Sequence, residues 1–147
     1  MEKVPLKEIL KGIAARYNFC FSSGFYYKKS NECIVVLELQ KSNYGSYFQV
    51  NIKVFIQGLF DKTYLINKDL IHKNVPDLFL GIPKEYENLF DLEYNDKLNE
   101  RKLGLEKLFE SYINPLSELL LTKQGIHLLS EKGEVFILPA VRRALNL

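Results

Sequence analysis

Two stretches with alternating polarity carry the residues whose types best suit binding. Residues 33–41 and 47–57 alternate apolar and polar side chains, so in β-strands the polar ones share one face. The candidate binding residues on this polar sheet face are Glu38, Gln40, Tyr47, Gln49, Asn51 and Lys53. Amides, a phenol and paired charges can hydrogen-bond a peptide or a small polar ligand. The alternative interpretation is that this face simply meets water.

Three apolar residues interrupt that polar face. Ile34, Val36 and Phe55 have the same parity as the polar residues and would otherwise face solvent. Apolar side chains among polar ones favour partial cover, by a helix of this chain or by a partner.

An aromatic stretch lies at residues 17–27, close to several cations. Its members are Tyr17, Phe19, Phe21, Phe25, Tyr26 and Tyr27, with Arg16, Lys28 and Lys29 nearby. Aromatic side chains exposed among cations could stack bases, so a nucleic-acid interface at strand 25–29 is an alternative function. Aromatic residues are also typical of strands and of cores, which is the interpretation we favour.

No pattern of catalytic or ligand-holding residues stands out. The two histidines, His72 and His127, have no nucleophile-elbow sequence near them, and no metal-binding or phosphate-loop spacing occurs. Glu93, Asp96 and Glu100 could share a helix face, which predicts solvation rather than a metal site. We therefore predict no enzyme, no cofactor and no metal. An enzyme with an unrecognised site is a further alternative.

Composition bounds the class of protein. The chain has 147 residues and 17.1 kDa, with 47% hydrophobic and 26% charged residues, which predicts one globular domain over residues 1–147. No apolar run is long enough for a membrane span and no secretory signal is seen. With only two cysteines, we expect a soluble cytoplasmic protein with reduced thiols.

Charge is unevenly distributed along the chain. The first 75 residues hold 11 basic and 6 acidic side chains, and the remainder hold 9 and 12. A basic half could favour an acidic partner, but a difference of this size is typical of ordinary solvated faces.

The elements that position these residues follow from periodicity. An apolar stripe at three- and four-residue steps predicts a helix from Pro5 to about Tyr17. Strands at 24–29, 33–41 and 47–57 follow it. A long helix capped by Asn95 or Asp96 comes next and is interrupted at Asn114-Pro115. A helix at 123–132 stops at Gly133, and a final helical turn or two follows Pro139.

This order predicts an α+β fold, a mostly antiparallel sheet with the N-terminal helix and a C-terminal helical segment packed on one face. Residues 58–83 predict another strand or two with irregular loops, and residues 89–94 a short strand. For the hairpin closed at residues 42–45, burial of the apolar face predicts odd residues opposite even ones. The register we expect places Leu39 opposite Phe48, Leu37 opposite Val50 and Val35 opposite Ile52.

Several of these segments resemble a bacterial family. Leu39-Gln40-Lys41-Ser42 with Gly45, Phe48, Val50, Asn51 and Val54 is similar to the family catalogued as domain of unknown function 4304. Gly24-Phe25 with Lys28-Lys29 resembles its first strand, and Phe90-Asp91-Leu92 resembles a later stretch. The resemblance covers about residues 5–57. It implies a small α+β bacterial domain and supplies no catalytic residue.

The function that these observations favour is a non-enzymatic binding or interaction module using the polar sheet face. Its partner would be another protein or a small polar ligand. An immunity-type or regulatory role suits this size by analogy. The pattern leaves the oligomeric state open.

Overall fold

The computed structural model describes residues 4–93 and 98–147. The helix cap predicted at Asn95 or Asp96 lies outside these residues. No helix in the described part of the chain is long and apolar enough to cross a membrane.

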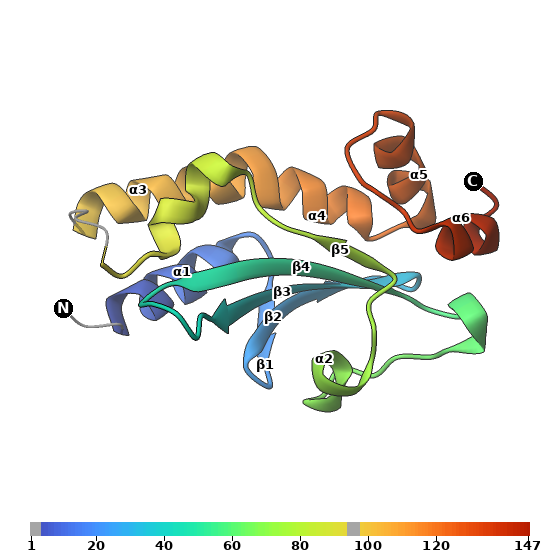
Figure 1. Ribbon diagram of the computed structural model, residues 1–147, viewed down its shortest axis with the longest axis horizontal. Coiled ribbons are helices and arrows are strands. Elements are labelled where there is room, and N and C mark those ends of the chain that lie inside the picture. Colours follow the sequence, from blue (N-terminus) through green and yellow to red (C-terminus); the bar gives the residue numbers. More distant parts are fainter. Residues whose placement is uncertain (1–3, 94–97) are drawn as a thin grey trace.

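A five-stranded antiparallel sheet forms the centre of the fold (Figure 1). The strands run in sequence order and every neighbouring pair is antiparallel. Their bounds are β1 Cys20–Ser22, β2 Phe25–Lys29, β3 Cys33–Lys41, β4 Phe48–Ile56 and β5 Leu78–Leu80. The predicted α+β class is confirmed, as is a strand within residues 58–83.

Most of the helices pack on one face of the sheet, and a single short helix lies on the other. They are α1 Val4–Arg16, α2 Asp69–Lys73, α3 Leu98–Leu108, α4 Asn114–Leu120, α5 Lys123–Glu131 and α6 Pro139–Leu145. Short 3-10 turns occupy Leu59–Asp61 and Lys84–Phe90, and a π-helical turn occupies Phe109–Ile113. Figure 1 shows α1, α3 and α4 along one face, here called the inner face, and α2 alone on the opposite, outer face.

The inner face carries the main hydrophobic core. The stripe of α1, with Leu6, Leu10 and Ile13, is buried against odd-numbered residues of β3 and even-numbered residues of β4. Val35 and Val54 are fully buried there. The predicted N-terminal helix and its apolar stripe are therefore confirmed.

A second, smaller core lies on the outer face. Phe25, Ile34, Val36 and Phe55 pack there with Tyr64 and Leu70, which come from the segment between β4 and β5. The three apolar residues that interrupt the polar face are thus covered by another segment of this chain. Cover by this chain was one of the two possibilities that the sequence favoured; cover by a partner was the other.

The β3–β4 register differs from the expected one by two residues. Leu39 lies opposite Val50 and Leu37 opposite Ile52, so odd still faces even and the buried faces are as predicted. The expected register needs a two-residue turn at Asn43-Tyr44, and the turn types favoured for such hairpins have positive φ at the first or at both of these positions. Neither residue has a positive φ.

A wider turn closes the hairpin instead. The backbone N–H of Ser42 donates to Tyr47 O, and the Ser42 hydroxyl accepts from the Tyr44 N–H. Four residues, 43–46, then connect the strands, which moves the pairing by two positions without exchanging the faces.

The predicted interruption at Asn114-Pro115 is wrong. Asn114 keeps right-handed helical angles, φ −66° and ψ −52°, and its N–H donates to Phe109 O five residues back. Proline lacks an N–H and crowds the carbonyl of the preceding turn. The π-helical turn widens the backbone just before the proline, so the helical segments α3 and α4 continue into one another.

Residues 89–94 were expected to form a short strand, and the described part of this segment does not. The 3-10 turn runs to Phe90, and Asp91 forms only an isolated bridge with Tyr47. The Arg101 guanidinium donates to the carbonyls of Leu89 and Asp91, which holds this segment against α3. The predicted stop at Gly133 is confirmed by its φ of 72° after α5.

Candidate functional site

Four of the six candidate residues form one hydrogen-bonded group on the outer face. Asn51 Nδ2 donates to Glu38 Oε1 at 3.2 Å and to Gln40 Oε1 at 3.0 Å. Lys53 Nζ lies 2.9 Å from Glu38 Oε1. We call Glu38, Gln40, Asn51 and Lys53 the polar cluster.

Strand pairing explains why these side chains meet. Glu38 lies directly opposite Asn51. Gln40 follows Glu38 by two residues and Lys53 follows Asn51 by two residues, so both point to the same face and lie diagonally across the strand pair. Cross-strand neighbours on one face are close enough to bond directly and along the diagonal. Phe79 of β5, paired with Lys53, places its ring centroid 5.9 Å from the ammonium.

The ion pair within the polar cluster is sheltered from water. The side chains of Lys53 and Glu38 are only 14% and 18% exposed. Salt and water screen a sheltered ion pair less than a surface pair, and removing one partner leaves the other charge buried without a counter-charge. Glu38 therefore holds both Asn51 and Lys53 in place.

Asn51 occupies an unusual position for a residue of a polar face. It is 2% exposed, and its Oδ1 is buried without a hydrogen-bond partner among the described residues. The prediction that this face simply meets water is therefore wrong at Asn51. A buried acceptor without a donor costs about 1–3 kcal/mol, so this oxygen lowers the stability of the fold.

The other two candidates, Tyr47 and Gln49, lie at the hairpin end and are exposed. Gln49 pairs with Gln40 across the strands. With the turn residues 41–44 these three side chains line a shallow groove of about 250 Å³. Gln40 therefore links Asn51 of the polar cluster to the open hairpin end.

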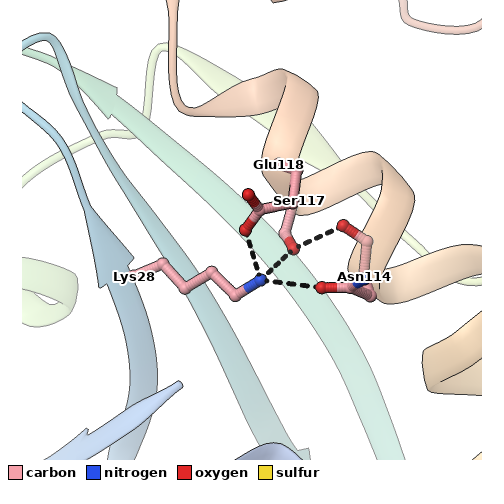
Figure 2. A network of polar contacts seen from close by, with 4 residues as sticks. All are labelled: Lys28, Asn114, Ser117 and Glu118. Atoms are coloured by element: carbon pink, nitrogen blue, oxygen red, sulfur yellow. Dashed lines mark hydrogen bonds and ion pairs between the residues drawn. The ribbon is translucent and has the colours of Figure 1, made fainter. Parts of the chain in front are cut away.

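Lys28, which follows the aromatic stretch, points to the inner face and bonds to α4. Lys28 Nζ donates to Asn114 Oδ1 at 3.1 Å, Ser117 Oγ at 3.0 Å and Glu118 Oε2 at 2.8 Å (Figure 2). It also lies 4.7 Å from the centroid of Phe19. All three ammonium protons are used, so this cation joins β2 to α4.

The aromatic stretch is mostly core, as favoured. Phe19, Phe25 and Tyr26 are buried, whereas Phe21 is 49% exposed. A nucleic-acid interface at strand 25–29 would therefore have Lys29 and the partly exposed Tyr27 available, but neither Phe25 nor the Lys28 ammonium.

The histidines are held in separate elements. His72 lies on α2, and His127 on α5 has Nε2 3.5 Å from Glu131. Within residues 4–93 and 98–147, no group of three histidine, cysteine, aspartate or glutamate side chains could hold a metal ion.

Two buried ionisable groups lie near the end of β4. Burial raises the pKa of the Cys33 thiol to about 12. Burial also raises the pKa of Asp77, although its carboxylate accepts the Ile56 N–H at 2.8 Å and a hydrogen bond from Tyr64. These contacts anchor the covering segment to β4.

Sequence reasoning missed two parts of this site. Phe79 lies within residues 58–83, where the sequence predicts another strand or two, but a three-residue strand has too few residues for a clear period, so the pairing of Phe79 with Lys53 could not be predicted. The burial of Asn51 depends on how the rest of the chain covers the sheet. Its apolar neighbours on the same face were the only local signal.

These features define an α+β domain whose antiparallel meander has a helical layer on one face and a half-covered polar face on the other. The chain belongs to the family described as "Domain of unknown function (DUF4304)", which matches residues 19–119. The resemblance is thereby confirmed: the match begins at residue 19 rather than near residue 5, and it extends beyond residue 57 through β5 and α3 into α4. No curated protein and no solved structure matches the chain.

Proposed function

We propose that this protein is a non-enzymatic interaction module that binds a segment of another protein at the hairpin end of the outer face. The contact residues are Gln40, Tyr47 and Gln49, and the hydrogen bond from Asn51 fixes the Gln40 amide. The observation that carries the proposal is the groove of about 250 Å³ that Gln40, Tyr47 and Gln49 line, in which the amide of Gln40 is already held by Asn51.

Preorganisation supports this proposal. Glu38 is fixed by Asn51 and Lys53, so the amide of Gln40 bonds to a scaffold that is already ordered. Side chains held before binding lose less entropy when a partner arrives. The exposed phenol of Tyr47 adds apolar area with a polar end, a combination enriched at protein interfaces.

The cellular setting is also a proposal. A bacterial, cytoplasmic location fits the two free thiols, of which Cys20 is exposed and Cys33 buried. An immunity-type or regulatory role fits an interaction module of this size by analogy.

Site-specific crosslinking tests the proposed surface. A photoreactive phenylalanine analogue replaces Gln49, and the matched control replaces Gln124, an exposed glutamine on α5. In cells of the source organism we expect a discrete adduct from position 49 and none from position 124. Addition of Tyr47→Ala to the Gln49 probe should reduce that adduct. Equal adducts from both positions, or none from position 49, would contradict the proposal.

A further inference from the structure

An apolar groove lies on the inner face, where α1 meets the β1–β2 turn and the β3–β4 hairpin. It encloses about 340 Å³. We call it the α1 groove and define it by Lys7, Leu10, Lys11, Phe21, Leu39 and Phe48. Its volume is at the low end of small-ligand sites, which measure about 300–1,000 Å³.

The apolar part of the groove is incompletely covered by the chain. Phe21 is 49% exposed and Leu39 is half-buried, although both belong to strands of a packed domain. The ring of Phe21 packs at a tilt against that of Tyr26, with ring centroids 4.9 Å apart. An apolar ligand placed here would cover surface that water otherwise contacts.

Two ammonium groups stand over the aromatic rings of the groove. Lys7 Nζ lies 5.6 Å from the Phe48 centroid, and Lys11 Nζ lies 5.1 Å from the Phe21 centroid. Spaced four residues apart, the two lysines share one face of α1. Among the described residues neither forms an ion pair, although Glu8 also lines the groove.

We propose that the α1 groove binds a small amphiphilic carboxylate. Its hydrocarbon part would lie on the exposed surfaces of Phe21 and Leu39, next to Leu10 and Phe48, and its carboxylate would accept hydrogen bonds from Lys7 and Lys11. Two cations with no ion pair among the described residues, beside an apolar floor, match an anion with an apolar tail, and the small volume favours a single-chain carboxylate over a larger lipid. This site is on the face opposite the polar cluster and does not depend on the function proposed above.

Titration with a matched series of ligands tests the assignment. Octanoate, octylammonium and 1-octanol share one chain and differ in charge, and NMR of the full chain follows the methyl signals of Leu10 and Leu39. We expect saturable octanoate binding at these methyls and about tenfold weaker octylammonium binding, the equivalent of one charge-assisted hydrogen bond. Equal binding of all three ligands, or octanoate shifts elsewhere, would overturn the proposal.

Charge reversal provides the second test. Lys7 and Lys11 are both exposed, so the double variant Lys7→Glu/Lys11→Glu should keep the fold and bind octylammonium more tightly than octanoate. The control Lys102→Glu/Lys132→Glu changes the net charge equally on exposed residues outside the groove. It should keep the original preference. An unchanged preference in the groove variant, or the same inversion in the control, would overturn the proposal.

A partner's chain segment is the alternative occupant of the groove. The capped peptide acetyl-Leu-Phe-Glu-amide, titrated under the same conditions, distinguishes it. Binding of this peptide together with failure of octanoate to bind would overturn the small-ligand assignment.

Discussion

Lys28 Nζ lies 2.8 Å from Glu118 Oε2, although 90 residues separate the two in the chain. The side chain of Lys28 is 3% exposed and that of Glu118 is 55% exposed. The ammonium therefore gives up its hydration, while the carboxylate keeps much of its own. Asn114 and Ser117 supply the acceptors that replace the lost water.

The first prediction concerns this buried ammonium. Lys28→Ala should lower the free energy of unfolding by about 3 kcal/mol, because it removes a buried stem and leaves the acceptors of Asn114 and Ser117 without the ammonium. Lys28→Met keeps most of the stem's volume but leaves the same acceptors without the ammonium, so it should cost about 1 kcal/mol less than Lys28→Ala. Urea denaturation followed by circular dichroism measures both losses. The control is Lys29→Ala, an exposed neighbour. A loss for Lys28→Ala no larger than this control would contradict the prediction.

The second prediction separates two residues of the same strand face. Asn51→Ala should lower the free energy of unfolding by about 2 kcal/mol, because Glu38 and Gln40 lose their buried donor. Gln49→Ala should cost less than about 0.5 kcal/mol, since Gln49 is exposed. Urea denaturation of the pair tests this difference. Equal losses would show that the face is not divided as the structure indicates.

The third prediction concerns pH. The raised pKa of Asp77 means that the folded protein binds its proton more tightly than the unfolded chain, whose value is 3.8. Its favourable contribution is complete below pH 3.8 and is lost as pH rises through the raised value. Asp77→Asn cannot ionise, yet its side-chain oxygen can still accept the Ile56 N–H.

Urea denaturation at a series of pH values tests this. The stability of the wild type relative to Asp77→Asn should fall as pH rises above 3.8 and then level off. Using the difference between the proteins removes the contribution of every other titrating group. A relative stability that rises with pH would show that the sign is wrong.

The fourth prediction concerns the two thiols. Cys20 is exposed, whereas Cys33 is buried and its pKa is raised to about 12, so little thiolate forms at pH 8. A maleimide reagent should label one thiol quickly and the second only in denaturant. Cys20→Ser should abolish the fast phase and Cys33→Ser should keep it, as measured by mass spectrometry. Fast labelling of Cys33 in the folded protein would contradict the burial described here.

Local alternation was sufficient to predict the buried faces of β3 and β4, because the period of two is a property of each strand alone. It was insufficient for the register, since both candidate pairings bury the same residues. The backbone of the turn between Ser42 and Tyr47 decided between them. Similarly, the proline rule at Pro115 describes one residue's preference, whereas a π-helical turn accommodates it over five.

The residues that make up the candidate site could be predicted from the sequence, but the degree to which each of them is buried could not. Alternation placed Glu38, Gln40, Asn51 and Lys53 on one face, and they do bond together. Which of them water reaches depends on the surrounding tertiary packing. The segment 58–77, which adds Tyr64 and Leu70 to the outer core, has no regular period to reveal that role.

The hairpin turn at residues 43–46 belongs to neither hydrophobic cluster, and Tyr44 within it is 93% exposed. Each doubling of a flexible loop costs only about 0.6 kcal/mol in closure entropy. New sequence inserted between Tyr44 and Gly45 would therefore project into solvent beside Gln40 and Gln49 while the scaffold stays intact. This turn is a place where evolution, or an engineer, can diversify recognition or graft a reporter without redesigning the domain.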